Sequence, residues 1–461
     1  MSTRYRDYSP EQPHLLPPSP QDWLPHGHLA YLVRDLVMEL DLGGIHRAYL
    51  KDPRGARGYD PRMMVGVLLY AWANDVYSSR RIARLCREDL GGRFLAAGHQ
   101  PDFRTISAFQ LLHGDALGDL FVQSVRLCQA AGMVSLVHVA MDGFKIEANA
   151  SKHKAMSYGR MLTTQERLRG EIANLQRQAR EMDSAEDNLF GKDAPGPSID
   201  EELRRRETRL ARIRRAREEL EAQAREAAAA QQAQRAEKEE RTGQATPGKK
   251  PAAPEEVKPK DKAQRNFTDP ESRIMKAASG AFIQGYNGQA AADSDHQVIV
   301  ACMLTNQAAD APHFAPVMEQ VSQNTGAVPA VRTADGGYFS KENVEHGPSA
   351  HTKTYIPPCR LKAATQETTG TFSLALSEEQ LSAAERMRRA LVTPEGHAAY
   401  ACRKKIVEPV FGQIKGCPGS PGFYRVLRRG LDKAQQEWRW VCATHNFLKY
   451  LRHTCVSPAP A

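Results

Sequence analysis

The stretch SLVHVAMDGFKIEANAS, residues 135–151, decides the fold, because here a helical pattern gives way to an apolar run. Such a run predicts a strand that is buried in a sheet. The run comprises Leu136, Val137, Val139, Ala140 and Met141. On this pattern the strand ends at Asp142-Gly143, and a second, shorter alternating stretch follows. We therefore expect Asp142 to lie at the end of a buried strand.

Further strand patterns follow downstream of residue 265. Strands are predicted over 280–293, 296–306, 330–340 and 352–358, with a helix over 313–324. The third of these strands ends at Asp335, before two glycines that let a ligand approach closely. The rest of the chain reads as helical. The order predicts an α/β fold, a mixed sheet with flanking helices, in which strand-end acids meet at one edge.

The residues before the sheet divide into two regions. Residues 1–27 carry several prolines and predict an extended arm, whereas residues 28–132 have a helical pattern. A helix is predicted over 63–74, behind the start signal Asp60-Pro61. Within residues 78–110, short helices, tight turns and outward arginines fit a helix-turn-helix-like DNA-binding domain. An ordinary helical bundle fits nearly as well.

Residues 161–265 interrupt the sheet-forming sequence. Their apolar residues recur in alternating steps of four and three, which predicts a coiled-coil hairpin of two antiparallel helices. From about residue 227 to 262 we expect a fraying helix and then a disordered linker. Residues 161–265 include 23 basic and 21 acidic residues. This near balance favours a role in the assembly of two protomers over a role in binding DNA. The sheet domain then comprises residues 133–160 and 266–455.

The charge of the chain is unevenly placed. The net charge is +9, and residues 400–461 contribute +8 of it. This concentration is typical of a surface that faces phosphates. Eight cysteines without a CxxC pair are expected to be reduced. Because no apolar run approaches the roughly 20 residues that span a bilayer, and the chain starts with a polar segment, we expect a cytoplasmic protein without membrane contact.

The segment YACRKKIVEPVFGQIK, residues 400–415, places one acid, Glu408, among four cations and two aromatic residues. The cations are Arg403, Lys404, Lys405 and Lys415. Cations this dense around a carboxylate indicate a polyanionic substrate, because paired surface charges alone stabilise little. A basic helix face exposed to solvent is the alternative interpretation.

Asp142, Asp335 and Glu408 are the acids that could converge at the sheet edge. Three carboxylates there could hold two divalent metal ions for an in-line phosphoryl transfer. Oxygen ligands and phosphate substrates select Mg²⁺, with Mn²⁺ as a substitute. Two alternatives stay open. An Asp-Gly pair at a strand end also forms a simple turn, and three other acids compete as the second ligand, namely Asp293, Asp295 and Asp310.

Several motifs of the chain are similar to those of one known family. They are YDPRMMVGVLLYAWANDVYSSRRIARLCREDLGGRFLAAG (59–98), MDGFKIEANASKH (141–153), NFTDPESRIMK (266–276), FIQGYNGQ (282–289), TADGGYFSKEN (333–343) and RKKIVEPVFGQIK (403–415). With these motifs in order, the chain resembles the bacterial insertion-sequence transposases of the DDE type. The resemblance implies an RNase H-like catalytic core, with Asp142, Asp335 and Glu408 as its catalytic, metal-binding triad.

The acidic helix of that group often carries a Tyr, Arg, Glu, Lys signature, with two, three and six residues between its members. Here two residues separate Tyr400 from Arg403 and six separate Glu408 from Lys415, but four separate Arg403 from Glu408. Either Arg403 or Lys404 therefore fills the arginine position. The proline after Glu408 disfavours helical geometry there, so we expect Glu408 to start a helix rather than lie inside one.

The resemblance implies a transposase that cuts double-stranded DNA at the terminal inverted repeats of its element and joins the ends to target DNA. Arg403, Lys404 and Lys415 would contact DNA phosphates. Tyr400 and Trp438 are possible base contacts, with core packing the alternative for Trp438. We expect a homo-oligomer, at least a dimer on DNA, associated with the nucleoid. The alternatives are a plain metal-dependent nuclease and a non-catalytic DNA-binding protein derived from a transposase.

Overall fold

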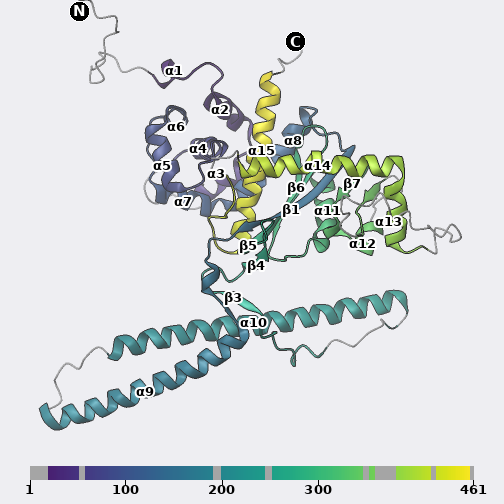
Figure 1. Cartoon of the computed structure of the whole chain (residues 1–461). Coiled ribbons are helices and arrows are strands. Elements are labelled where there is room, and N and C mark those ends of the chain that lie inside the picture. The colour runs from purple at the N-terminus through teal and green to yellow at the C-terminus, as the bar shows by residue number, and fades with distance from the viewer. Residues whose placement is uncertain are drawn as a thin grey trace, which may run out of the picture.

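The computed structural model describes residues 19–50, 58–190, 199–243, 245, 252–345, 352–358, 381–416 and 422–456. A helical N-terminal part, a sheet flanked by helices and a long two-helix arm make up these residues (Figure 1). Most of the extended arm predicted over 1–27 lies outside the described residues. Its described residues, 19–27, include the short helix α1 (Pro20–Trp23).

The N-terminal part is helical, as its periodicity predicts. Its further helices are α2 (Leu29–Glu39), α3 (Gly43–Leu50), α4 (Pro61–Ala73), α5 (Ser79–Glu88), α6 (Leu90–Leu95), α7 (Phe103–Leu112) and α8 (Gly114–Ala130). Helix α4 begins at the predicted signal, because the carboxylate of Asp60 accepts a hydrogen bond from the Arg62 amide at 2.7 Å. The arginines of α5 are exposed, as expected. A DNA-binding role for residues 28–132 stays a prediction.

The sheet is mixed and has six strands. They are β1 (His138–Glu147), β4 (Arg273–Lys276), β5 (Phe282–Asp293), β6 (Ile299–Thr305), β7 (Val331–Ala334) and β8 (Lys353–Tyr355). β5 is antiparallel to β1, β4 and β6, whereas β7 is parallel to β1 and β8. The four downstream strands thus lie in the predicted ranges, and the flanked mixed sheet confirms the α/β, RNase H-like fold class.

One strand boundary was predicted wrongly. β1 does not end at Asp142 but runs on to Glu147 as one ten-residue strand. Its pairing with β5 continues without a shift through Asp142 and Gly143. A Cβ atom at position 143 would lie 2.6 Å from the side-chain nitrogen of Gln289, so glycine here permits close packing rather than a turn. The apolar run marks only the half of the strand that is most deeply buried.

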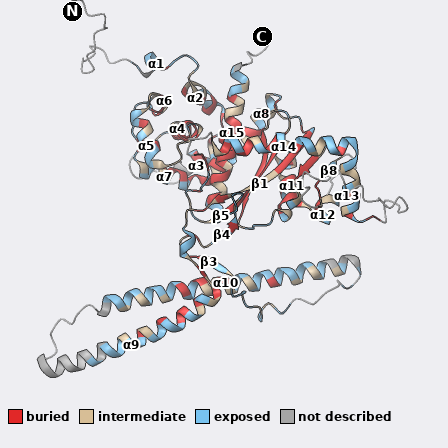
Figure 2. Cartoon of the chain, viewed as in Figure 1, coloured by how far each residue is buried: buried red, intermediate tan, exposed pale blue. Residues whose placement is uncertain are grey.

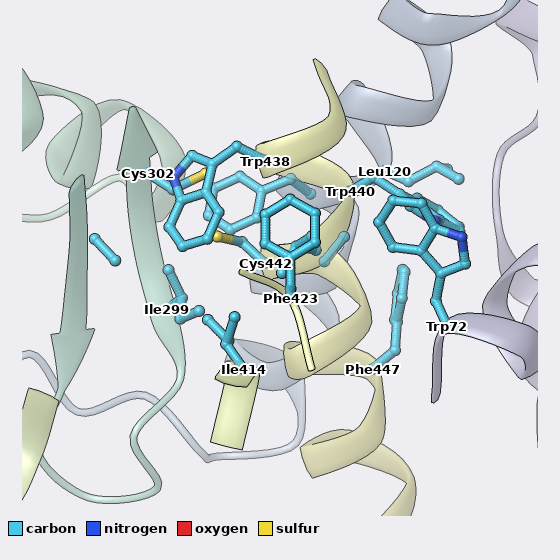
Figure 3. Close-up of a cluster of buried hydrophobic side chains, with 14 of the residues drawn as sticks. Trp72, Leu120, Ile299, Cys302, Ile414, Phe423, Trp438, Trp440, Cys442 and Phe447 are labelled. Carbon is cyan, nitrogen blue, oxygen red and sulfur yellow. The ribbon is translucent and has the colours of Figure 1, made fainter. Parts of the chain in front are cut away.

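Helices connect the sheet to the N-terminal part. Those that follow β6 along the chain are α11 (Phe314–Thr325), α12 (Lys341–Glu345), α13 (Ala383–Val392), α14 (Pro394–Lys415) and α15 (Leu431–Val456). Helix α15 packs on β6 and on α8, and α14 packs on β1. Figure 3 shows this junction, where Trp72 of α4 lies near Trp440 and Phe447 of α15. One continuous buried cluster therefore includes both the N-terminal helices and the sheet.

Helix α14 holds Glu408 and Pro409 in its interior, so the prediction that Glu408 starts a helix is wrong. Pro409 has no amide hydrogen and leaves the carbonyl oxygen of Lys405, one turn earlier, without its helical partner. The side-chain amide of Gln297 donates to that oxygen at 2.9 Å. A residue from the turn between β5 and β6 thus replaces the missing helical hydrogen bond.

The arm consists of α9 (Tyr158–Phe190) and α10 (Ile199–Thr242), which confirms the predicted helical hairpin. It leaves and rejoins the sheet domain between β2 (Ala155–Ser157) and β3 (Gln264–Asn266), which pair with each other. Its small apolar core is separate from the main cluster, and most of its surface is exposed (Figure 2). Helix α10 continues to Thr242, where fraying from about residue 227 was expected, and part of the predicted linker lies outside the described residues.

In the part of the chain that the structure describes, no helix is both long and apolar enough to cross a membrane. The cysteines of that part are free, in line with the expected reduced state. The cytoplasmic location itself stays a prediction.

Candidate active site

Asp142 and Asp335 lie side by side on neighbouring strands. β1 and β7 are parallel, with Met141 opposite Ala334, so the next residue on each chain segment is one of the two acids. Adjacent strands lie about 4.8 Å apart. Asp335 follows β7 directly and caps the short helix η3 (Gly336–Tyr338), its carboxylate accepting from the Gly337 amide at 2.8 Å. The register of the two strands therefore brings these acids together.

The surroundings of Asp142 oppose a bare negative charge. Burial raises the pKa of Asp142, and the charge of Asp335 adds to the increase. The Gly143 amide, which donates to the carboxylate at 2.8 Å, and the guanidinium of Arg403 act in the opposite direction. A carboxylate that burial and a like charge destabilise gains from the approach of a cation.

Arg403 of α14 extends into the space between the acids. Its side chain is only 7% exposed, donates to Asp142 at 3.1 Å and lies 3.9 Å from Glu408. Burial disfavours its positive charge, but Asp142, Tyr400 and Asp335 together outweigh that effect, and the pKa of Arg403 is raised. Lys404, the other candidate for the arginine position, is exposed. Of the two, Arg403 is the one that contacts the acids.

Glu408 lies on the same helix and is more exposed than Asp142, with 53% of its side chain accessible. Among the described residues, no three acidic, histidine or cysteine side chains are grouped closely enough to hold a metal ion. The guanidinium of Arg403 lies between two of the acids, within 4 Å of both Asp142 and Glu408. Arg403 is thus the cation that links Asp142 and Glu408.

Two further predicted contacts border the acids. The ammonium of Lys415 lies 4.7 Å from the ring centre of Phe144, two residues along β1 from Asp142. Burial lowers the pKa of Lys415, and the charge of Asp142 offsets part of that decrease. The ring of Tyr400 faces the guanidinium of Arg403 at 5.9 Å, and burial raises the pKa of Tyr400. Both side chains stand beside the acids.

Trp438 lies in the core, which corrects the expectation of a base contact. Its side chain is fully buried, and its indole N–H donates to the carbonyl oxygen of Gln289 at 3.1 Å. The ring packs edge-on against Phe144. It also stacks on Phe423 (Figure 3). Trp438 therefore packs in the core, which was the alternative interpretation for this residue.

Of the three acids that compete as second ligand, Asp310 lies nearest to the site. A Cβ atom on Gly337 would lie between Asp310 and Asp335, 3.5 Å from the first and 2.9 Å from the second. Side chains of Asn287, Gln289 and Lys145 already donate to one oxygen of Asp310, at 2.7, 3.0 and 3.1 Å. One oxygen of Asp310 is therefore already occupied by three donors.

The other two competitors lie away from Asp142. Asp293 is paired with Val139 at the far end of the β1–β5 ladder, and its carboxylate accepts from the amides of Leu136 and Asp295. Asp295 is exposed in the turn that follows. Position in the ladder therefore distinguishes acids that sequence spacing left equivalent.

Tyr338 is a residue of the site that sequence patterns did not identify. Its hydroxyl donates to the side-chain oxygen of Gln289. Burial raises the pKa of Tyr338 well above its ordinary value, and the charges of Asp310, Asp142 and Asp335 add to the increase. The charges of three aspartates thus act on one buried hydroxyl. The only signal was its place three residues after Asp335, within the TADGGYFS motif.

The donor set suits a hard divalent cation. Asp142 and Asp335 offer only oxygen atoms, the ligands that Mg²⁺ and Mn²⁺ prefer. Glu408 would add a third carboxylate once Arg403 moved toward another anion. Because burial disfavours the uncompensated charge of Asp142, the residues present fit a divalent metal ion.

Two family models match the chain. One, described as a transposase DDE domain, matches residues 242–447, and the other, described as a transposase domain (DUF772), matches residues 18–111. No curated protein and no solved structure gives a significant match. The first match includes Asp335 and Glu408, and the second covers most of the N-terminal helices; Asp142 lies between them.

Proposed function

Because the chain belongs to the family of DDE-type insertion-sequence transposases, we propose that it cuts DNA at the ends of its own element and joins those ends to target DNA. Asp142, Asp335 and Glu408 are the proposed catalytic acids. The single observation that supports them best is the parallel register of β1 and β7, which brings Asp142 next to Asp335. Arg403 then connects this pair to Glu408 on α14.

Members of this family use divalent metal ions. We assign their binding to the three proposed acids, with Mg²⁺ as the ion and Mn²⁺ as its substitute. When bound, such an ion would activate the attacking oxygen and neutralise charge on the phosphate. The acids themselves need no covalent bond to DNA, since water and then a DNA 3′-hydroxyl are the attacking groups.

Basic residues of α14 receive the phosphate in this proposal. Arg403 is already oriented by Asp142, and its planar guanidinium can exchange that carboxylate for two oxygens of a phosphodiester. Lys415 adds a point charge from the other end of the site, and exposed Lys404 contacts the backbone further out. Tyr400, beside Arg403, is the remaining candidate for a base contact.

The experiment uses purified protein and a DNA fragment that carries the inverted repeats flanking the reading frame. One substrate has an intact element end, and the other has a pre-cut end with a free 3′-hydroxyl. With Mg²⁺, we expect cleavage of the first and joining of the second to a target plasmid. Cleavage without joining would make the protein a plain nuclease, and binding without either reaction would make it a non-catalytic DNA-binding protein. Either result would overturn the proposal.

A further inference from the structure

A basic groove lies at the base of the arm, where α10 faces the loop between β1 and β2. It has a volume of about 740 Å³. Its basic lining residues are Lys154, Arg160, Arg204, Arg205, Arg209 and Arg212. Glu201 is the acidic residue of the same lining, and it pairs with Arg205 at 2.6 Å. The walls of the groove therefore carry a strong excess of positive charge.

The arginines of α10 differ between its two faces. Arg206 and Arg217 lie toward α9, are partly buried and pair with carboxylates of the arm. Arg204, Arg209 and Arg212 are exposed toward the groove, and among the described residues no carboxylate pairs with them within 4.0 Å. The arm is nearly neutral in composition, but the groove lining carries six basic residues and a single carboxylate, Glu201.

The groove continues toward the sheet. A second hollow shares His153, Lys154 and Thr268 with the first and adds Arg425 and Arg429. A third shares Arg429 with the second, adds Arg428 and Lys433, and reaches the start of α5 in the N-terminal part. These neighbouring hollows form a path from the arm past the sheet domain to the N-terminal helices, and its acids are Glu201, Glu437 and Glu147, the last paired with Arg425.

We propose that this path, which we call the arm groove, binds the phosphate backbone of double-stranded DNA, with Arg204, Arg209 and Arg212 as direct contacts. The inference rests on the proposed function, because it takes the DNA of the candidate active site as its ligand. Exposed arginines that have no carboxylate partner suit DNA phosphates. They can displace the counterions of the DNA without first breaking an ion pair within the protein. In this proposal the arm contacts DNA, in addition to any role in the assembly of protomers.

The distance from the acids fits one bound duplex. Glu147 lines the second hollow and stands five residues after Asp142 on β1. At about 3.4 Å per residue this is about 17 Å, the length of about five base pairs. A duplex that has its scissile phosphate at Asp142 would therefore reach the second hollow of the path within about half a helical turn.

The experiment compares two triple variants of the full-length protein with the wild type. The groove variant carries Arg204→Ala, Arg209→Ala and Arg212→Ala. The matched control carries Arg214→Ala, Arg215→Ala and Arg225→Ala, which removes three exposed arginines of the same helix that do not line the groove. Circular dichroism and melting establish that both are folded. The probe is a mixed-sequence duplex of about 40 base pairs, because phosphate contacts do not depend on sequence.

We expect the groove variant to bind the duplex more weakly and with a salt dependence, log K against log [salt], shallower by about 3, since each lost phosphate contact removes about 0.9. The control variant keeps the wild-type slope to within about 1. Equal slopes for the two variants would overturn the proposal. The proposal would also be overturned if the groove variant bound DNA as the wild type does and differed only in the association of protomers, measured without DNA. The groove would then bind protein.

A failure of the proposed function gives a different result. If the wild type neither cuts nor joins DNA but the groove variant still has the shallower slope, the arm groove stands and the catalytic proposal falls. If the wild type cuts and joins DNA while both variants bind with the wild-type slope, the catalytic proposal stands and the arm groove falls. The two proposals are therefore separable.

Discussion

Burial and the nearby charge of Asp335 both disfavour the negative charge of Asp142. A cation beside Asp142 offsets this effect, whether the cation is Arg403, as here, or a divalent metal ion. We predict that Asp142→Asn reduces Mg²⁺-dependent cleavage by about 10³-fold or more. The amide keeps the size of the carboxylate and can still accept from the Gly143 amide, so DNA binding should persist, but the melting temperature should fall because buried Arg403 loses its charged partner. Single-turnover cleavage of an element end measures the effect.

Asp295→Asn is the control for that substitution. Asp295 is an exposed acid that competed for the same role on sequence grounds, and its loss should leave the cleavage rate unchanged. A cleavage rate for Asp142→Asn that equals the wild-type rate would refute the assignment of the acids.

Glu437 of α15 illustrates how a buried acid affects stability. Burial raises the pKa of Glu437 to about 7, although the amides of Leu427 and Arg428 donate to its carboxylate. Its ordinary pKa is 4.5, so the folded state binds the proton more tightly than the unfolded state does. This contribution to stability is complete below about pH 4.5 and is lost as the pH rises to about 7.

We predict that Glu437→Gln removes this loss, which amounts to about 3 kcal/mol across the window. The glutamine oxygen can still accept from the Leu427 amide. Urea unfolding at several pH values between 4.5 and 7.5 measures the free energy of unfolding for both proteins. The wild type should lose more stability over that range than the variant, and parallel curves would show that Glu437 does not titrate in it.

At the scale of the element, α14 depends on a neighbour to tolerate its proline. We predict that Pro409→Ala raises the free energy of unfolding by about 1–3 kcal/mol, because alanine restores the amide donor and the helix propensity. Gln297→Ala should cost about 1 kcal/mol in the wild type and less in the Pro409→Ala background, where the Lys405 carbonyl has a helical partner again.

Denaturant unfolding of the two single variants and the double variant gives this coupling. Gln297 also accepts from Lys449 at 3.3 Å, but that contact is lost in both backgrounds and cancels in the cycle. Additive effects would mean that the Gln297 hydrogen bond does not compensate for the proline.

At the scale of the whole molecule, two apolar cores divide the chain. The main cluster joins the N-terminal helices to the sheet, and the arm has its own. The arm leaves and returns through paired strands, with Ser157 opposite Gln264. We predict that replacing residues 159–262 by a short turn lowers the melting temperature by no more than about 4 °C, because the main core is untouched. Calorimetry measures this.

The same replacement should weaken DNA binding, as expected if the arm groove contributes contacts. Its matched comparison is the groove variant, which keeps the arm and removes only three charges. A replacement that fails to fold would show that the small arm core and the main core are coupled, and that the arm is not an independent insertion.

Local patterns in the sequence were sufficient to predict the order of helices and strands, the helical hairpin and the acids of interest. Apolar periodicity is a short-range property, so the ranges of β5 to β8, α4 and α11 could be read from it. Two local rules gave wrong results. Gly143 indicated a turn but permits packing against Gln289, and Pro409 indicated a helix start but is compensated by Gln297. In each case the deciding partner lies more than 100 residues away.

What the sequence by itself determined was the fold class, the motifs and the chemical types available for a site. The tertiary structure decided which of those residues meet. Strand register placed Asp335 beside Asp142 and Asp293 at the far end of the ladder, and the packing of α14 on β1 selected Arg403 over Lys404. It also buried Trp438 and turned unpaired arginines of α10 into one wall of a groove. Periodicity records which face of an element is apolar, whereas contacts between distant elements depend on how those faces pack in three dimensions.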